Sequence, residues 1–437
     1  MIQDYQAALA LIHGRPRFGK AETLTRMQAL LTLLGNPQDQ LQYVHVTGTN
    51  GKGSVSRMTE QILSAHGLRV GLYTSPFIMR FNERIQINHV NISDADLVRW
   101  VQKLEPLLAQ LDAQAADGPT EFETITALMF AYFAEQKVDI VVLEVGIGGL
   151  LDSTNIIQSK LVSVITTVAF DHQKLLGNTL TAIATQKAGI IKGPRHPTVV
   201  GRLPVEALQV IAHKTKQLKI LDHDFWLEHV QKDANGYFKF DFVNQHGLKL
   251  TNLILNLKGT YQLGNSAVAI MTAQLALQAL NIELKPAAVQ AALQNVTWPG
   301  RFEYLQQQPP VVIDGAHNLA GVNSLLDTLK QQPAKHIEII MGVLTDKDYP
   351  AMLKRLKTDS RVHLTVVAFA APNQRQVVQP NNNNMEAAVD ATAVDFEQAY
   401  AALQPLPTDT LVVFTGSLYF ISAVRQAFIT KKTSKIR

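Results

Sequence analysis

One glycine-rich turn restricts what this chain can fold into more than any other feature. The turn occupies residues 45–54 and reads HVTGTNGKGS. An apolar, β-branched run (43–46) precedes it, and a helical pattern of apolar residues (55–63) follows it. Glycines let backbone N–H groups approach phosphate oxygens, and the helix N-terminus adds partial positive charge. The segment therefore predicts a phosphate-binding loop in an α/β domain.

The spacing inside this turn departs from the standard phosphate-loop pattern. Fewer residues separate Gly48 from Gly51, and Gly53 intervenes between the lysine and the serine. An ordinary tight turn is the alternative. We favour phosphate binding, because Lys52 can reach the β- and γ-phosphates and Ser54 can help to hold magnesium.

Composition limits the class of protein. The 437 residues exceed one ordinary core, and 46% hydrophobic with 17% charged residues is a globular balance. The net charge of +4, without a long Lys/Arg block, suits anionic small molecules and argues against nucleic acid. The absence of cysteine excludes disulfides, thiolate catalysis and Cys-ligated zinc. With neither a signal-peptide pattern nor a membrane-length apolar run, we expect a soluble, cytoplasmic protein that binds no membrane.

Strand and helix patterns alternate along the chain. Apolar runs at 138–145 and 161–168 are typical of buried parallel strands, and helical patterns cover 23–34 and 120–136. This order predicts a doubly wound, P-loop-type sheet. Alternation around Asn235-Gly236 predicts a small antiparallel element on this domain.

A break at Trp298-Pro299-Gly300 predicts a domain boundary. Beyond it the alternation resumes, which indicates a second, smaller α/β domain. We therefore expect a first domain with the phosphate-binding loop at 1–297 and a second α/β domain at 298–437.

Polar residues stand where predicted strands end. Ser75, Glu144 and the pair Asp171-His172 each lie at or just beyond such an end. Ligands of open α/β sheets bind at this edge, so these side chains can converge beside the phosphates. A hydroxyl and a carboxylate suit Mg²⁺, whereas imidazole favours softer metals, and two metal sites would reconcile the set. Each residue alone is equally a satisfied polar group at a strand end.

Three further residues are ambiguous by themselves. Lys187 lies in an apolar helical segment, where an exposed structural lysine is the ordinary interpretation. A buried lysine would instead have a lowered pKa and could add CO₂ to form a carbamate ligand. In the second domain, Asp314 could bind ribose hydroxyls and Arg301 could neutralise phosphate charge, although an Asp-Gly pair is usually only a turn.

Several longer motifs together resemble one family, the folylpolyglutamate synthases in the superfamily of ATP-dependent muramyl-peptide ligases. The motifs that carry the resemblance are HVTGTNGKGS (45–54), YTSPFIMRFNERIQIN (73–88), LEVGIGG (143–149), DSTN (152–155), DHQKLLGNTL (171–180), QKAGIIK (186–192), WPGRFE (298–303), DGAHN (314–318) and TGSLY (415–419). The resemblance implies an ATP-binding (P-loop) domain at 1–297, a C-terminal Rossmann-like ligase domain at 298–437, and an active site between them. ATP would phosphorylate the γ-carboxylate of a folate, and L-glutamate would attack the acyl phosphate. This reaction is the polyglutamylation of folates, which belongs to one-carbon metabolism.

The resemblance also implies residue roles. It assigns ATP binding to Gly51, Lys52, Gly53, Ser54, Asn265, Arg301, Asp314 and His317, and magnesium to Ser75, Glu144 and His172. Lys187 matches the carbamylated lysine, N6-carboxylysine, and is grouped with Lys52, Glu144 and His172 as catalytic. Residues 74–84, including Ser75, Pro76, Phe77 and Arg84, match a loop beside the folate. A monomer and stimulation by K⁺ are family expectations.

Two departures limit the resemblance. Many members carry an arginine after the Gly-Gly pair, where this chain has Leu150 and Leu151, and many carry glutamate at Gln186. The first weakens any inference about the pterin substrate. The alternatives are a dihydrofolate synthase, alone or bifunctional, a muramyl-peptide ligase that uses a UDP-sugar, and a nucleotide switch without ligase activity.

Overall fold

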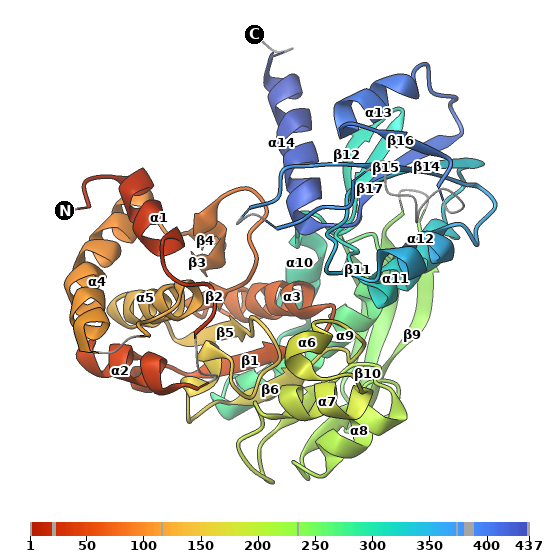
Figure 1. The fold of residues 1–437 in the computed structure, drawn as a ribbon. Helices are drawn as coiled ribbons and strands as arrows, with labels where there is room; N and C mark the ends of the chain where they lie inside the picture. The colour runs from red at the N-terminus through yellow and green to blue at the C-terminus, as the bar shows by residue number, and fades with distance from the viewer. Residues whose placement is uncertain are drawn as a thin grey trace. The chain divides into compact units, whose positions relative to one another are not determined.

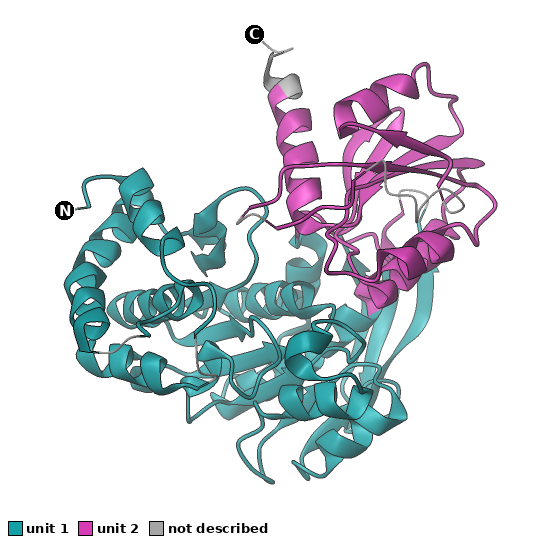
Figure 2. Ribbon diagram, viewed as in Figure 1, with its two compact units in different colours: residues 1–233, 239–256, 264–296 teal, residues 234–238, 257–263, 297–437 magenta. Residues whose placement is uncertain are grey.

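The computed structural model describes residues 2–19, 23–114, 117–233, 236–372, 375–379 and 389–434. Clustering of contacts divides the chain into two compact units (Figure 2). Unit 1 comprises 1–233, 239–256 and 264–296, and unit 2 comprises 234–238, 257–263 and 297–437. Two short segments before residue 297 therefore group with unit 2. The division of function between domains at 297 and 298 stays a prediction.

Unit 1 is built around a sheet in the order β4-β3-β2-β5-β1-β6-β7-β8 (Figure 1). The strands from β2 to β8 in this order are parallel, and β3 and β4 form an antiparallel edge. The strands are β1 (Tyr43–Thr47), β2 (Val70–Tyr73), β3 (Ile85–Ile87), β4 (Val90–Asn91), β5 (Ile140–Glu144), β6 (Val162–Ile165), β7 (Thr198–Val200) and β8 (Leu218–Ile220). The connection after β1 runs towards β2, whereas those after β5 and β6 run the other way. This reversal at β1 is where a doubly wound sheet binds its ligand.

Helices cover this sheet. They are α1 (Tyr5–His13), α2 (Thr25–Leu33), α3 (Lys52–Ala65), α4 (Asp94–Gln114), α5 (Glu121–Glu135), α6 (Gln173–Leu176), α7 (Leu180–Ala188), α8 (Val205–Ala212), α9 (Tyr261–Ala279) and α10 (Pro286–Asn295). One apolar cluster joins α1, α2, α4 and α5 to Tyr43 and Tyr73 of the sheet. A second joins α7 and α8 to Ile165 and Val200. The buried residues of α3 belong to neither cluster, and α3 packs against β1, β2, β5 and α10.

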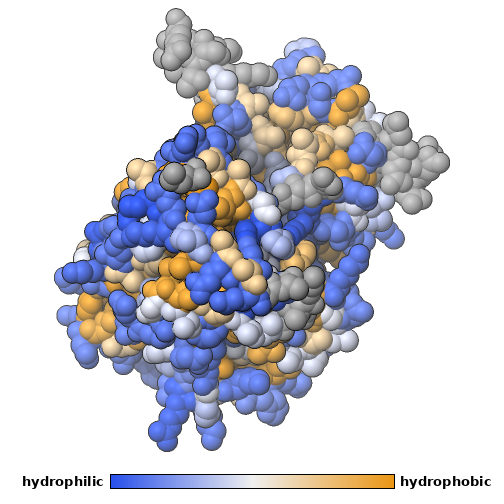
Figure 3. Space-filling model, turned by 60° about the vertical axis from the view of Figure 1, so that its left-hand side comes forward, coloured by the Kyte–Doolittle hydropathy of each residue, from blue (hydrophilic) through white to orange (hydrophobic). Residues whose placement is uncertain are grey.

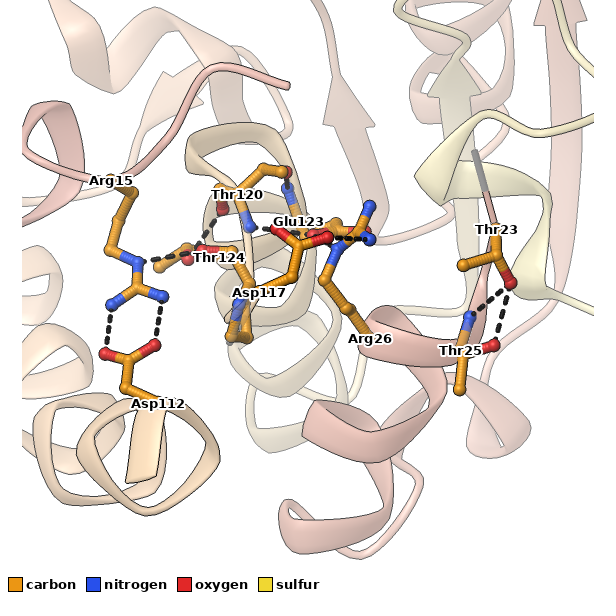
Figure 4. A network of polar contacts seen from close by, with 10 residues as sticks. Arg15, Thr23, Thr25, Arg26, Asp112, Asp117, Thr120, Glu123 and Thr124 are labelled. Carbon is orange, nitrogen blue, oxygen red and sulfur yellow. Dashed lines mark hydrogen bonds and ion pairs between the residues drawn. The ribbon is translucent and has the colours of Figure 1, made fainter. Parts of the chain in front are cut away.

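Two arginines, Arg15 after α1 and Arg26 in α2, make ion pairs with α4, with α5 and with the segment between these two helices (Figure 4). Arg15 makes a two-pronged ion pair with Asp112, at 2.6 and 2.7 Å. Arg26 pairs with Asp117 at 2.8 Å and with Glu123 at 3.1 Å. Because Glu123 is also part of the capping box of α5, this network sets where that helix begins.

A separate small sheet has the order β11-β10-β9 and is formed by β9 (Phe225–Lys232), β10 (Phe238–Asn244) and β11 (Lys249–Leu255). The connections between these neighbours are too short for a parallel crossover, so the strands form hairpins. The antiparallel element expected here is therefore present, and α10 packs against β11. Of the predicted turn pair, Asn235 lies outside the described residues.

Unit 2 contains a sheet in the order β12-β13-β17-β14-β15-β16, parallel except for β12 at one edge. Its strands are β12 (Glu303–Gln307), β13 (Pro310–Ile313), β14 (His336–Met341), β15 (Val362–Val367), β16 (Ala391–Ala393) and β17 (Thr410–Thr415). Its helices are α11 (Leu319–Leu329), α12 (Tyr349–Leu356), α13 (Phe396–Ala402) and α14 (Leu418–Ser434). The predicted α/β fold class is confirmed in both units.

Candidate active site

The glycine loop connects β1 to α3 and is clamped by the residues that follow β6. The Asn50 N–H donates to Thr167 Oγ1 at 2.9 Å, and the Asn50 carbonyl accepts from Thr166 Oγ1 at 2.5 Å and from Thr167 Oγ1 at 3.0 Å. The Thr49 N–H donates to the Thr167 carbonyl at 2.9 Å. These bonds hold the loop open at the sheet edge where a phosphate would approach.

Two glycines are required by close contacts. Gly48 has φ +155°, and a Cβ there would lie 1.9 Å from Thr166 Oγ1. Gly51 precedes α3 with φ +86°, and a Cβ there would lie 2.7 Å from Asn265 Oδ1. Both positions combine a left-handed backbone with no room for a side chain. The second contact also brings Asn265, from α9, against the loop, as the predicted ATP site requires.

Lys52 and Ser54 lie in the first turn of α3. The Lys52 ammonium donates to the carbonyls of Gly48 at 3.0 Å and of Thr49 at 3.3 Å, so it lies over the loop. Ser54 is buried in the same turn. The backbone N–H groups of a helix N-terminus beside a lysine form a binding site for a polyphosphate.

Lys187, near the end of α7, is almost fully buried, with 2% of its surface exposed. Burial, and then the positive charge of Lys52, lower its pKa from 10.5 to about 7, while Asp171 and Asp152 oppose this shift. These electrostatic interactions place Lys187 near the glycine loop and the segment after β6. An amine with this pKa is substantially neutral at physiological pH and can react as a nucleophile. The ordinary alternative, an exposed structural lysine, is wrong.

The predicted magnesium residues come from neighbouring connections at one edge of the sheet. Glu144 is the last residue of β5, pairs in register with Val46 of β1, and is 3% exposed. Ser75 follows β2 and is half-buried, and His172 precedes α6 with φ +50°. Among the residues that the structure describes, no group of three or more His, Asp or Glu side chains could hold a metal ion. A cation here would thus depend on hydroxyl, water and phosphate oxygens, as Mg²⁺ commonly does.

The segment 74–84 is folded around one carboxylate. Glu83 accepts the N–H groups of Ile78 at 2.8 Å, Met79 at 3.1 Å and Arg80 at 3.0 Å. The Arg84 guanidinium lies over the ring of Phe77 at 5.2 Å and over that of Phe81 at 5.6 Å. Pro76 is exposed beside them. The loop therefore holds the Arg84 cation against the half-buried ring of Phe77, whereas Phe81 is 2% exposed and belongs to the core.

In unit 2, Asp314 follows β13 and is buried. It accepts hydrogen bonds from the Tyr261 hydroxyl at 2.6 Å, the Phe302 N–H at 3.0 Å and the Ala316 N–H at 2.9 Å. Burial raises the pKa of Asp314, and these hydrogen bonds and Arg301 oppose the shift.

Arg301 and His317 flank the turn that Asp314 begins. A Cβ on Gly315 would lie 2.1 Å from an Arg301 guanidinium nitrogen, so glycine leaves room for that side chain. His317 Nδ1 lies 2.7 Å from the Gly315 carbonyl oxygen, which makes Nδ1 the donor. Asp314, Arg301 and His317 are thus brought together around one turn.

The comparisons with known proteins agree with this geometry. The Mur ligase middle domain matches residues 46–273, and the Mur ligase glutamate ligase domain matches residues 300–418. A folylpolyglutamate synthase of Lacticaseibacillus casei is 44% identical over 98% of this chain and 100% of its own length. The chain belongs to the folylpolyglutamate synthase family of Mur ligases. It is an ATP-dependent ligase.

Two further relatives of this family are informative. A Bacillus subtilis dihydrofolate synthase/folylpolyglutamate synthase is 37% identical over 98% of this chain and 99% of its own length. A solved FPGS–AMPPCP–folate complex superposes with a TM-score of 0.87 at 42% identity, covering 97% of this chain and 99% of the other. None of the helices in the described parts of this ligase has the length and apolar composition that a membrane crossing requires.

Sequence reasoning assigned no role to several residues of the site in this ligase. Thr166 and Thr167 hold the glycine loop, and Tyr261 holds Asp314, but a hydroxyl after a strand or at a helix start carries no signal by itself. Asp152 stood in a quoted motif, and the structure buries it with both carboxylate oxygens hydrogen-bonded. Leu150 and Leu151, the departures from the family, are partly exposed. Figure 3 shows hydrophobic residues scattered among hydrophilic ones on the face that it displays.

Proposed function

We propose that this ligase adds L-glutamate to the γ-carboxylate of folates and folylpolyglutamates. A carboxylate oxygen of the folate attacks the γ-phosphorus of ATP, and ADP leaves. The amine of glutamate then attacks the acyl carbon, an amide bond forms, and phosphate leaves with the former carboxylate oxygen. The observation that carries this proposal is the likeness, over nearly the whole chain, to a folylpolyglutamate synthase and to an FPGS–AMPPCP–folate complex.

Unit 1 is proposed to hold the triphosphate. The N–H groups of Gly51, Gly53 and Ser54 would contact phosphate oxygens, and Lys52 would leave the loop carbonyls to neutralise transferring charge. Phosphoryl transfer depends on such positioning and charge neutralisation more than on covalent help. Asn265, which lies against Gly51, would contact ATP from α9.

Magnesium, when bound, would supply positive charge for the phosphoryl oxygens. The residues that would hold it are Ser75, Glu144 and His172, which the sheet brings to the same edge as the glycine loop. The donor set fits, because Mg²⁺ takes one or two carboxylates and completes its shell with water and phosphate. A second site and a role for K⁺ stay predictions.

Lys187 is proposed to act as a carbamate. The neutral amine would add CO₂, forming an N–C bond and releasing one proton, which gives an anionic oxygen ligand. The burial that lowers the pKa of this amine favours the addition. The nearby charge of Lys52 would then attract the carbamate.

Unit 2 is proposed to contribute Arg301, Asp314 and His317 to nucleotide binding, with Arg301 on phosphate and Asp314 on ribose hydroxyls. The segment 74–84, with Ser75, Pro76, Phe77 and Arg84, is proposed to contact the folate. A cytoplasmic location and a monomeric state stay predictions.

One experiment separates this function from its alternatives. Labelled glutamate and MgATP are incubated with the protein and either tetrahydrofolate or dihydropteroate, and labelled products and ADP are quantified. We expect glutamate addition to tetrahydrofolate. Addition to dihydropteroate alone would identify a dihydrofolate synthase, and addition to both acceptors would identify a bifunctional enzyme. If no ADP were released with either acceptor, the proposal would be rejected.

A further inference from the structure

A line of polar side chains crosses one face of the unit 1 sheet between two apolar clusters. Tyr43, His45 and Thr47 of β1 point to the same face, because alternate residues of a strand do so. Tyr43 belongs to the cluster under α5, and Ile165, which pairs with Thr47, belongs to the cluster under α7 and α8. His45 therefore lies at the seam between them, in a position that apolar residues usually fill.

The seam contains a continuous chain of hydrogen bonds. Lys160 Nζ lies 2.8 Å from His45 Nδ1, and His45 Nε2 lies 2.8 Å from Thr154 Oγ1. Thr154 Oγ1 lies 2.6 Å from Asp152 Oδ1. The four residues are at most 8% exposed, and His45 and Thr154 are fully buried. An apolar environment makes each of these bonds costly to break.

Asp152 and Lys160, at the two ends of this chain of hydrogen bonds, determine which atom donates and which accepts in each bond. Asp152 accepts backbone N–H groups at both oxygens, from Thr154 at 3.0 Å and from Ile147 at 2.9 Å, so its carboxylate is an acceptor. Lys160 donates N–H whether its amine is charged or neutral. Thr154 must therefore donate to Asp152 and accept from His45, which makes His45 the neutral Nε2–H tautomer with Nδ1 as acceptor. Burial lowers the pKa of His45 and favours this neutral form.

This chain of hydrogen bonds runs from the amino ends of the strands towards their carboxyl ends. Lys160 lies just before β6 begins, and the glycine loop lies at the opposite ends of the strands. Asp152 binds the N–H of Ile147 in the turn just after β5, which ends at Glu144. Thr47 Oγ1 donates to the Gly148 carbonyl at 2.6 Å, so the same turn is also tied to the end of β1.

The geometry points to Lys160, His45 and Thr154 as positioning residues of this ligase. Their hydrogen bonds, each with a defined donor and acceptor, hold Asp152 in place. Asp152 in turn holds the turn 146–148, which follows the magnesium candidate Glu144. This inference rests on the proposed role of Glu144. Residues that orient a metal ligand without touching the metal commonly change metal affinity or activity about 10- to 100-fold when replaced.

The test replaces Thr154 by valine, which keeps its shape and removes its hydroxyl. Thr272→Val is the matched control, because the buried Thr272 hydroxyl donates to the Val268 carbonyl of its own helix, at 2.7 Å. We expect Thr154→Val to lower kcat about 10- to 100-fold and to raise the Mg²⁺ concentration for half-maximal rate, with a smaller change in KM for glutamate. Thr154→Ser should restore both, and Thr272→Val should change neither at a similar loss of thermal stability.

Two further measurements do not depend on turnover. Mn²⁺ binding in the presence of AMPPCP, followed by electron paramagnetic resonance, should weaken about 10-fold in Thr154→Val and in Lys160→Met. The ¹⁵N shifts of His45 should show the Nε2–H tautomer in the wild type. A protonated or Nδ1–H His45, or Mn²⁺ binding and kcat that change equally in Thr154→Val and Thr272→Val, would overturn the inference. If the wild-type protein ligated no glutamate, the proposed function would be overturned. The tautomer of His45 would still test the arrangement of hydrogen bonds.

Discussion

At the residue scale, the burial of Lys187 lowers the pKa of its amine and supports the proposed carbamate. Replacing it by alanine removes the group that would carry the carbamate, so turnover should fall by at least about 100-fold. Added short-chain carboxylates should restore part of the rate by occupying the vacated position. Lys174→Ala is the control, because Lys174 is an exposed lysine of α6. Unchanged turnover in Lys187→Ala would reject the carbamate.

The pH dependence expected of the proposed carbamate follows from the same burial. Burial lowers the pKa of the Lys187 amine from 10.5 to about 7, so the neutral form that adds CO₂ increases as the pH rises through about 7. The carbamate, measured by ¹³C NMR with ¹³CO₂, should therefore increase between about pH 6 and pH 8. Between about pH 7 and pH 10.5 the unfolded state binds more protons at this lysine than the folded state, so the free-energy cost of burying it decreases, and stability rises, as the pH increases through that range. A ¹³C signal that persists in Lys187→Ala would assign the carbamate elsewhere.

The proposed role of Arg301 can be tested by a substitution that displaces its side chain without removing it. Gly315→Ala adds a Cβ within 2.1 Å of its guanidinium at a backbone conformation that alanine accepts, so the side chain must move. We expect Gly315→Ala and Arg301→Ala to raise KM for ATP by about 10-fold or more, since each would displace the cation that is proposed to bind phosphate. Thermal unfolding should show that both variants fold. Normal ATP kinetics in Arg301→Ala would remove this residue from the site.

Sequence reasoning reached the residues that belong to contiguous motifs. The glycine loop, Glu144 and Lys187 stand in such motifs, and Asn265, for which an ATP contact stays a prediction, lies against Gly51. Contacts made between distant segments had no such signal. The chain of Lys160, His45 and Thr154 depends on strand register and on which face each side chain takes, and no spacing in the sequence reveals it.

At the scale of elements, the Arg15 and Arg26 network offers a matched comparison (Figure 4). Arg26→Met leaves the Glu123 side chain, which is 5% exposed, without its cation, and should cost about 2–4 kcal/mol of unfolding free energy. Arg15→Met leaves Asp112, whose side chain is 44% exposed, and should cost less than about 1 kcal/mol. Urea unfolding measures both. Equal costs would show that burial does not set the strength of these pairs.

The elements predicted well were those with long, periodic patterns. The helices expected at 23–34 and 120–136 are α2 (Thr25–Leu33) and α5 (Glu121–Glu135), whereas the strand expected at 161–168 is only β6 (Val162–Ile165). Short or irregular elements carried too little pattern. The edge strands β3 and β4 are of this kind, and α4 contains Pro106, which ordinarily ends a helix.

At the scale of the whole molecule, the fold class and the ligase activity were predictable because the motifs run in family order along nearly the entire chain. The grouping of 257–263 with unit 2 was not. It depends on Tyr261 bonding to Asp314 and on the Thr260 N–H donating to Thr328 Oγ1 at 3.1 Å, and both are contacts between remote segments.

The most direct test of the proposed reaction follows the oxygen atoms. Tetrahydrofolate labelled with ¹⁸O in its γ-carboxylate is incubated with the protein, MgATP and L-glutamate, and the released phosphate is analysed by mass spectrometry. The acyl phosphate route predicts one ¹⁸O in the phosphate for each glutamate added. Glutamate addition that yields phosphate without ¹⁸O would contradict it.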